Sequence, residues 1–232
     1  MHVGDALFHH VEFQRFVDFI LEKENRYVLI NGDIINNNLT CSVGSPYDDL
    51  ISPNDQKKEV KRMLMPLRER ILCLNGGNHE ERTKKTAGQD ISEEIAESLG
   101  VAYNEDENFL RLSIGKRDNN NKPYVYTLYI THGAGGGKLP GSTLNNIEAL
   151  SKNILADIYV VGHSHRRIGH KSIFRYPDLR NNKIIEMTQL YVAAAGWLTY
   201  GGYPVRKMLR QQVRGSHPIT LWGNRKEVTT TL

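Results

Sequence analysis

The sequence predicts an α/β fold. Short apolar runs, which are typical of buried strands, alternate with longer segments whose apolar residues recur at helical spacing. The chain has 232 residues, of which 39% are hydrophobic and 24% are charged, and this suits one domain with a substantial core. We expect strand–helix–strand units first and mostly antiparallel strands afterwards, in a single domain over residues 1–232.

Four segments carry apolar residues at the spacing of amphipathic helices. In the first, Phe13, Val17 and Ile20 fall on one face, and after the third, Gly100 supplies a stop signal. Residues 81–88 are mostly polar, and we expect them to leave a strand as a turn. The predicted helices are residues 8–21, 56–70, 92–99 and 143–155.

Apolar runs that end at Gly, Asn or Asp mark the predicted strands. Between two of them, residues 36–55 are rich in Asn, Ser, Gly, Pro and Asp and predict a long loop. Cys73 lies inside an apolar run and is expected to be a buried thiol. The predicted strands are residues 27–30, 71–74, 110–114, 124–130, 158–161, 168–175, 183–195 and 218–222, with a hairpin turn at 118–122.

Cysteine content and hydropathy favour a cytoplasmic protein. Cys41 and Cys73 are the only cysteines; they make no disulfide framework, which suits a reducing compartment. The longest apolar stretch, residues 190–198, is too short to span a bilayer. The N-terminal residues lack the basic and apolar regions of a signal peptide. We expect no membrane partner, and the oligomeric state stays open.

Basic residues gather at the C-terminal end. Residues 201–232 hold six basic residues against one acid, a charge of +5, so the first 200 residues sum to about −1 of the total of +4. A basic end could steer a phosphate-rich substrate, or it could be a solvated rim. Aromatic residues in the tail after Gly196 could stack bases or pack in the core or at an interface; they are Trp197, Tyr200, Tyr203 and Trp222.

Four short polar motifs follow predicted strands. Strand ends at one edge of a sheet bring distant residues to one point, and a divalent cation needs carboxylate, amide and imidazole ligands at such a point. The motifs therefore predict a polynuclear metal centre and a metal-dependent hydrolase. They are Asn31-Gly32-Asp33, Gly77-Asn78-His79-Glu80, Thr131-His132-Gly133 and Gly162-His163-Ser164-His165.

Each motif also has an ordinary structural interpretation. A Gly-Asp pair such as the one at Asp33 is a common turn, and a single strand-end histidine is more often structural than a ligand. In an extended chain, His163 and His165 would point the same way and contact two adjacent metals. The glycines that follow His132 could bring backbone close to a phosphate or form a loose loop; they are Gly133, Gly135, Gly136 and Gly137.

In this order and spacing, the motifs resemble the calcineurin-like metallophosphoesterase superfamily. The resemblance covers about residues 2–170 and leaves 171–232 as C-terminal strands and a basic tail. Residues 32–82 and 131–137 further resemble phage-encoded members, which suggests DNA metabolism. The resemblance implies a four-layer α/β/β/α sandwich with two divalent metal ions (Mn, Fe, Zn or Ni) at the strand ends.

The resemblance also implies a role for each residue. Asp33 would bridge the metals, and His79 would be the general acid or the group that polarises phosphate, not a ligand. Arg82 could contact phosphate or be a surface charge. Asn78, His132 and His163 would complete one metal site with Asp33, and His165 would belong to the other. The implied metal ligands are His2, Asp33, Asn78, His132, His163 and His165.

The family's opening Asp-x-His motif is incomplete here. His2 fits its histidine, so the aspartate and the first β-strand would precede Met1. Asp5 is a less natural alternative, and His9 or His10 could substitute as ligands. Either the sequence starts at an internal methionine of a longer protein, or its first metal site is damaged. We favour the longer protein, because loss of a central strand would expose neighbouring strand edges.

These observations predict a phosphoesterase that is a phosphodiesterase or nuclease, with a phosphate-ester substrate and possibly nucleic acid as its partner. The basic C-terminal region and the phage-like resemblance favour this reading. A phosphomonoesterase of the protein-phosphatase kind is one alternative. A scaffold that has lost catalysis is another, because the first-motif aspartate is absent.

Overall fold

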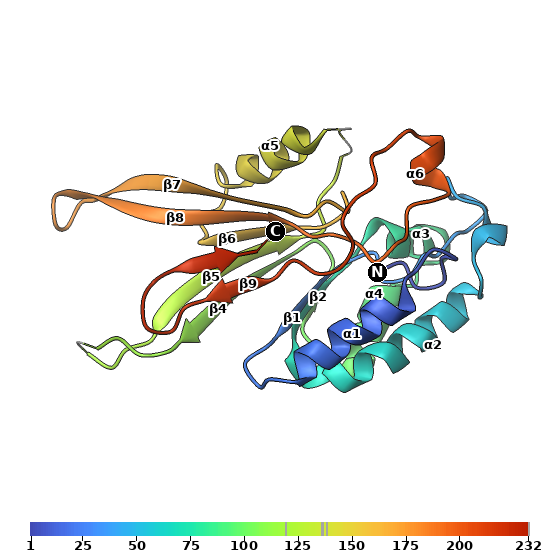
Figure 1. Cartoon of the computed structure of the whole chain (residues 1–232), viewed down its shortest axis with the longest axis horizontal. Helices are drawn as coiled ribbons and strands as arrows, with labels where there is room; N and C mark the ends of the chain where they lie inside the picture. Colours follow the sequence, from blue (N-terminus) through green and yellow to red (C-terminus); the bar gives the residue numbers. More distant parts are fainter. Residues whose placement is uncertain (119, 136, 138, 232) are drawn as a thin grey trace.

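Two β-sheets packed face to face, with helices on both outer faces, form the fold in the computed structural model (Figure 1). The structure describes residues 1–118, 120–135, 137 and 139–231. The predicted α/β class and the α/β/β/α layer order are both confirmed. None of the helices in these residues has the length and apolar character needed to cross a bilayer.

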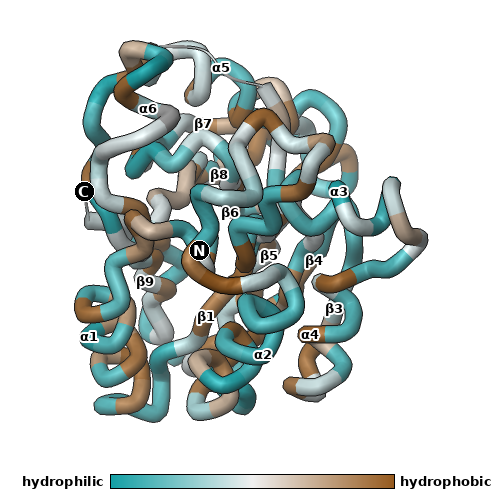
Figure 2. The backbone as a smooth tube through the Cα atoms, turned by 90° about the vertical axis from the view of Figure 1, so that its right-hand side faces the viewer, coloured by the Kyte–Doolittle hydropathy of each residue, from teal (hydrophilic) through white to brown (hydrophobic). Residues whose placement is uncertain are grey.

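The first sheet has three parallel strands, and helices cover its outer face. Val17, Leu64 and Ile95 from three helices are buried against the sheet residues Ile30 and Leu74. In the end-on view of Figure 2, these helices alternate hydrophobic and hydrophilic residues, as amphipathic helices do. The elements are α1 (His10–Leu21), β1 (Val28–Asn31), α2 (Pro53–Leu64), β2 (Ile71–Asn75), α4 (Ile91–Leu99) and β3 (Tyr103–Asn104), with strand order β1-β2-β3.

The second sheet has five strands in the order β4-β5-β6-β8-β7. Its middle strands β5, β6 and β8 run parallel, and the outer strands pair antiparallel with their neighbours. Ile147 of α5 packs on Tyr129, Tyr159 and Tyr191 of the outer face. The elements are β4 (Glu107–Ile114), β5 (Tyr124–Thr131), α5 (Pro140–Leu150), β6 (Ile158–Val161), β7 (Ile168–Asp178) and β8 (Lys183–Ala193).

The core between the sheets is apolar. Cys73 of β2 packs there with Tyr126, Leu128 and Ile158 of the second sheet. The predicted burial of this thiol is confirmed, and burial raises the pKa of Cys73 to about 12. A C-terminal ribbon closes this core through Val228; its strands are β9 (Ile219–Leu221) and β10 (Val228–Thr230).

The predicted turn at residues 81–88 is wrong, because this segment belongs to helix α3 (Asn78–Ala87). Glu80 and Glu81 lie in its first turn, where they interact favourably with the helix dipole, and Gly88 ends it with a left-handed φ of 69°. The helix shows no apolar stripe because its buried residue is the charged Glu80. Hydrophobic periodicity therefore misses it.

Other predicted elements are present with shifted ends. The helix expected at 56–70 is divided into α2 and a 3-10 helix, η2 (Met65–Arg70), because Pro66 lacks the N–H that an α-helix would need there. The predicted loop at 36–55 contains a short 3-10 helix, η1 (Pro46–Asp48), and the start of α2. A four-residue helix, α6 (Tyr203–Arg206), was not expected.

No strand precedes β1 in the described part of the chain. Residues 1–3 instead lie beside residues 33–35, just beyond the end of β1. The backbone N–H of His2 donates to Asp33, and that of Val3 donates to Ile34, both at 2.9 Å. Val3 and Ile35 form an isolated parallel bridge. This pairing carries His2 to the edge where the strands end.

Candidate metal centre

The C-terminal ends of β1, β2, β5 and β6 lie together, although these strands belong to two sheets. Asn31, the last residue of β1, connects the sheets. Its Nδ2 donates to the carbonyl of Thr131, and its own carbonyl accepts a hydrogen bond from Nδ1 of His132, both at 2.7 Å. The four motifs therefore meet at one place, as their positions after strands predict.

Two glycines permit this close approach. A Cβ atom at Gly32, where φ is +70°, would lie 2.4 Å from the carbonyl oxygen of Gly76. A Cβ at Gly77 would lie 2.1 Å from the backbone nitrogen of Asp33. Any side chain at either position would push the ends of β1 and β2 apart.

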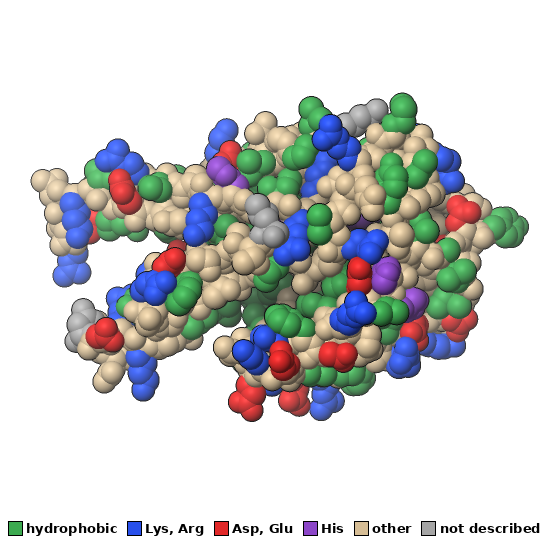
Figure 3. Space-filling model, in the orientation of Figure 1, with side chains coloured by type: hydrophobic (Ala, Val, Ile, Leu, Met, Phe, Trp, Pro, Cys, Tyr) green, Lys and Arg blue, Asp and Glu red, His purple; other side chains and the backbone are tan. Residues whose placement is uncertain are grey.

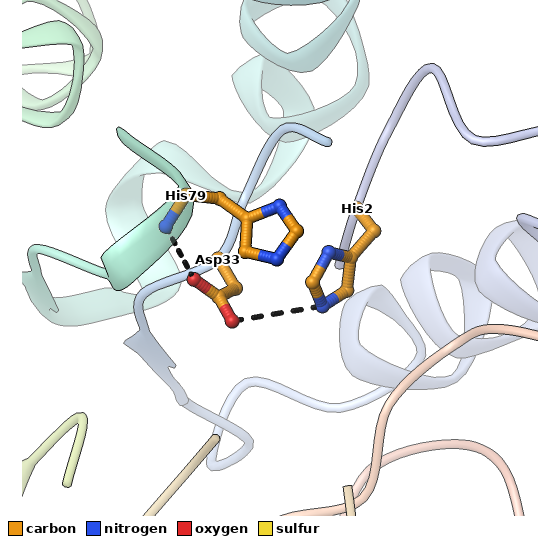
Figure 4. A group of neighbouring side chains, drawn as sticks. All are labelled: His2, Asp33 and His79. Carbon is orange, nitrogen blue, oxygen red and sulfur yellow. Dashed lines mark hydrogen bonds and ion pairs between the residues drawn. The ribbon is translucent and has the colours of Figure 1, made fainter. Parts of the chain in front are cut away.

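His2, Asp33 and His79 form a first group of possible ligand atoms, all within 4.8 Å of one another (Figure 4). Nε2 of His2 lies 3.7 Å from Oδ2 of Asp33. The rings of His2 and His79 meet edge to face, with centroids 4.4 Å apart. His165 adjoins this group, because its Nε2 is 2.8 Å from Nε2 of His2.

Asp33, His132 and His163 form a second group within the same 4.8 Å limit. Nε2 of His132 is 3.3 Å from Oδ2 of Asp33. Asn78 joins this group through its amide oxygen, which lies 3.0 Å from Nε2 of His132 and 2.8 Å from Nδ1 of His163. Asp33 is common to both groups.

The donor atoms fit divalent cations. Carboxylate oxygen, amide oxygen and imidazole nitrogen are the ligands that borderline divalent metals take. His132 donates its Nδ1–H to the carbonyl of Asn31, which leaves the Nε2 lone pair for a metal, as is usual for metal-binding histidines. The residues named as ligands from the sequence therefore converge, with His79 as an additional neighbour.

Glu80 holds the loop that carries Asp33. Its side chain is buried, and its two carboxylate oxygens accept hydrogen bonds from the backbone N–H groups of Asp33, Ile34 and Ile35 at 3.1, 2.7 and 2.9 Å. The motif contains Glu80, but the sequence assigned it no role. Its place directly after Asn78 and His79 was the only signal, and three backbone partners 45 to 47 residues away are not readable from sequence.

The site favours neutral imidazoles around one charged carboxylate. Burial lowers the pKa of His2, His79 and His163, and it lowers the pKa of His165 to about 4. Burial works against ionisation of Asp33, but hydrogen bonding to His132 and the nearby imidazoles hold its pKa well below the usual value. Neutral imidazole and ionised carboxylate are the forms that bind metals.

His132 differs from the other imidazoles. Burial works against its positive charge, but the hydrogen bond to Asp33 and the charge of that carboxylate outweigh burial and raise the pKa of His132. A cation beside Asp33 would compete with this proton, because metal ligands must be deprotonated.

His163 and His165 reach different groups by a route that the sequence did not predict. Their backbones are left-handed, with φ of 59° and 53°, and are not extended. The prediction that both side chains point the same way because the chain is extended is therefore wrong. The intervening N–H of Ser164 donates to Gly162 at 2.6 Å in a tight turn, and this turn aims His163 at Asn78 and His165 at His2.

His79 and Arg82 both contact the 36–38 loop. Nδ1 of His79 lies 2.5 Å from the carbonyl oxygen of Asn36, and its backbone N–H donates to Oδ1 of Asp33 at 3.0 Å. Nη1 of Arg82 donates to the carbonyls of Asn36 and Asn37, both at 3.2 Å. Arg82 thus anchors the loop that orients His79, and its contact with phosphate stays a prediction.

The alternative ligands His9 and His10 lie elsewhere. Nδ1 of His9 accepts a hydrogen bond from the N–H of Glu12 and caps α1, and His10 is exposed on that helix. Among the described residues, neither histidine belongs to a group with ligand spacing.

Arg166 fixes the glycine-rich segment after β5. Its buried guanidinium donates to the carbonyls of Gly137 and Leu139 at 2.6 and 2.7 Å and to Oγ1 of Thr143 at 2.7 Å. Gly133 and Gly135 have positive φ angles, and Gly136 lies outside the described residues. This segment borders a small cavity of about 160 Å³ beside His163.

A groove of about 1100 Å³ opens over both ligand groups. Residues 198–214, here called the basic segment, form one of its walls. Tyr47, Asp48 and Leu50 of the predicted 36–55 loop line it as well. Trp197, just before the basic segment, packs in the core on Phe13 rather than in the groove.

The donor set that converges at these strand ends has the ligand types of a divalent-metal centre. The sequence matches the calcineurin-like phosphoesterase family over residues 1–182, and the chain belongs to that family. No curated protein matches it. Among solved structures, it is similar to a double mutant of Vps29 from Entamoeba histolytica, with 11% identity and a TM-score of 0.41 over 98% of this chain and 92% of that chain.

Proposed function

We propose that the protein hydrolyses phosphodiesters with two divalent cations bound side by side. The observation that carries this proposal is the pair of ligand groups that share Asp33. A carboxylate has two oxygens and can contact two cations, as in two-metal phosphoesterases. Cations bound there would supply Lewis-acid charge for the phosphate oxygens and activate water.

The protein's own residues would hold the ligands in place. His2, Asp33 and His165 would serve one cation, and Asn78, His132 and His163 would serve the other with Asp33. Glu80 fixes the backbone on both sides of Asp33, and Asn31 fixes the ring of His132. Such fixed ligand geometry reduces the reorganisation required in the transition state.

His79 is suited to move a proton. Its Nδ1–H donates to the carbonyl of Asn36, so Nε2 is the atom that faces His2 and Asp33 (Figure 4). Burial lowers the pKa of the ring, but the negative charge of a bound phosphate would favour its protonated form. Nε2–H could then protonate the leaving oxygen.

The groove supports a diester rather than a monoester. A phosphate with a single substituent needs only the ligand groups and a small pocket, whereas this groove continues from them along the basic segment. A volume of about 1100 Å³ is slightly larger than the range of about 300–1,000 Å³ that small-molecule sites show. A substrate that extends on both sides of the reacting phosphate would fill it.

Turnover of bis(p-nitrophenyl) phosphate with added Mn²⁺, Fe²⁺, Zn²⁺ or Ni²⁺ tests the proposal, with p-nitrophenyl phosphate as the monoester control. We expect metal-dependent release of nitrophenol, faster from the diester. Faster turnover of the monoester would contradict the diester assignment. Metal binding without turnover of either compound would contradict hydrolysis and favour a role as a scaffold.

A further inference from the structure

The basic segment has arginines without acidic partners. Within the described part of the chain, the side chains of Arg206 and Arg210 make no hydrogen bond or ion pair, and both are exposed. Both line the groove that contains the ligand groups. Other groove-lining cations differ: the guanidinium of Arg214 is bound by both oxygens of Glu12, at 2.8 and 2.9 Å.

The Arg214–Glu12 pair fixes one end of the segment. Bidentate contacts of this kind have a defined geometry, and here they join the end of the segment to α1. At the other end, Trp197 is buried against Phe13 and Phe16. Arg206 and Arg210 are therefore presented on a stretch of chain that is held at both ends.

The opposite wall has a different character. Tyr47 is 96% exposed and lines the groove, as do Asp48, which follows it in the chain, and Asp5, whose backbone forms a bridge with Asp49. The carboxylate of Asp49 accepts hydrogen bonds from Asn36, Asn38 and Gln56. The groove therefore has one cationic wall and one wall with an aromatic ring and the carboxylates of Asp5 and Asp48.

We propose that this groove binds a single strand of nucleic acid, with its phosphates along Arg206 and Arg210 and a base stacked on Tyr47. Guanidinium groups pair with phosphate oxygens, and aromatic side chains stack bases without regard to sequence. A duplex carries a second row of phosphates, which Asp5 and Asp48 would repel. The proposal rests on the proposed function, because the ligand groups would cleave the strand that the basic segment holds.

The test measures binding of a short fluorescein-labelled oligodeoxythymidine by fluorescence anisotropy in EDTA, so that no cleavage occurs. An R206A/R210A variant should bind at least about tenfold more weakly than the unaltered protein. The slope of log K against log salt should decrease by about 1.4, because each phosphate contact with a single strand contributes about 0.7. R206K/R210K should keep most of this slope.

R180A/K183A is the matched control. It removes the same charge at the tip of the β7–β8 hairpin, at the opposite end of the molecule from α6 (Figures 1 and 3). Neither residue lines the groove, and we expect unchanged binding. An equal loss of affinity in R180A/K183A, or none in R206A/R210A with circular dichroism unchanged, would overturn the proposal.

Competition identifies the class of ligand. Unlabelled oligodeoxythymidine and oligouridine should displace the probe, and their relative potency tells DNA from RNA. Equal displacement by a duplex of the same length, or by poly-glutamate, would overturn the single-strand assignment. Binding and hydrolysis are measured separately, so their outcomes can be told apart. If the unaltered protein leaves bis(p-nitrophenyl) phosphate intact with every metal but its binding depends on the two arginines, the strand-binding proposal is supported and the proposed hydrolysis is contradicted.

Discussion

Several candidate ligands at this site hold backbone conformations that non-glycine residues rarely adopt. His2, Asp33, His163 and His165 all have φ between 48° and 62°. Each such residue costs of the order of 1 kcal/mol or more, so surrounding contacts must hold it. For Asp33 these contacts are the hydrogen bonds from residues 33–35 to Glu80. The strain falls on the residues whose directions the site depends on.

Replacing His79 with alanine distinguishes a role as proton donor from a role as metal ligand. If it acts as a proton donor, His79→Ala should lower kcat about 10²- to 10⁴-fold and leave the metal content near that of the unaltered protein. Metal content is measured by inductively coupled plasma mass spectrometry after gel filtration. Asn78→Ala is the comparison, and it should lose metal.

Loss of metal from His79→Ala would make His79 a ligand and contradict its role as acid. The ring of His79 lies in the first ligand group with His2 and Asp33, so the metal content of the variant decides between the two roles.

The identities of the candidate ligands were readable from the sequence, but their arrangement was not. Asp33, Asn78 and His132 each follow a strand, and strand ends meet. The contact of His79 with Asn36 and that of Glu80 with three backbone N–H groups join segments more than 40 residues apart. No local pattern encodes such pairs. The left-handed backbones at His163 and His165 were also hidden, because left-handed φ is usually predicted at glycine.

Among the elements, α3 is a helix at the candidate site that hydrophobic periodicity does not predict. It begins with Asn78 and His79 and directs Glu80 inward, so the face it buries is polar. The strands β1, β2 and β6 were predicted nearly to the residue, because both of their faces are covered and they read as continuous apolar runs. Strands β3 and β10 were not predicted, because strands of two or three residues are too short to show an alternating hydrophobic pattern.

Two glycines provide a matched test of how helix ends are specified. Gly88 ends α3 with φ of +69°, and an added Cβ would meet nothing within 4 Å. Gly88→Ala should therefore destabilise the protein by about 1 kcal/mol through backbone strain alone. Gly141 lies inside α5 with equally open space and no positive φ. Gly141→Ala should stabilise the protein by up to about 1 kcal/mol.

Urea unfolding followed by circular dichroism measures both changes. Destabilisation by both substitutions, or by neither, would show that the left-handed backbone at the end of α3 does not determine whether alanine raises or lowers the free energy of unfolding.

At the scale of the whole molecule, the ligand groups join the two sheets. Asp33 and Asn78 come from the first sheet, and His132, His163 and His165 come from the second. The layer order was implied by family resemblance. Composition and periodicity indicated only α/β, because which sheet faces which depends on contacts between distant strands.

Bound metal should therefore stabilise the entire fold. With free metal at about 100 times its Kd, one site adds about 2.7 kcal/mol to the free energy of unfolding. We expect Mn²⁺ to raise the Tm and EDTA to reverse the rise, measured by differential scanning fluorimetry. His163→Ala should lose much of this gain, whereas His170→Ala, at an exposed pair with Glu148, should keep it. An equal gain in both variants would place the metal elsewhere.

The spacing of the ligands along the chain has a consequence for biosynthesis. His2 and His165 touch across 163 residues of sequence. At translation rates of about 5–20 residues per second, on the order of ten seconds pass between the synthesis of the two. While residues 80–131 are being synthesised, the nascent chain contains Asp33, Asn78 and His79 without their partners from the second sheet. Cellular metal can be captured in the final geometry only after the ribosome has passed residue 165.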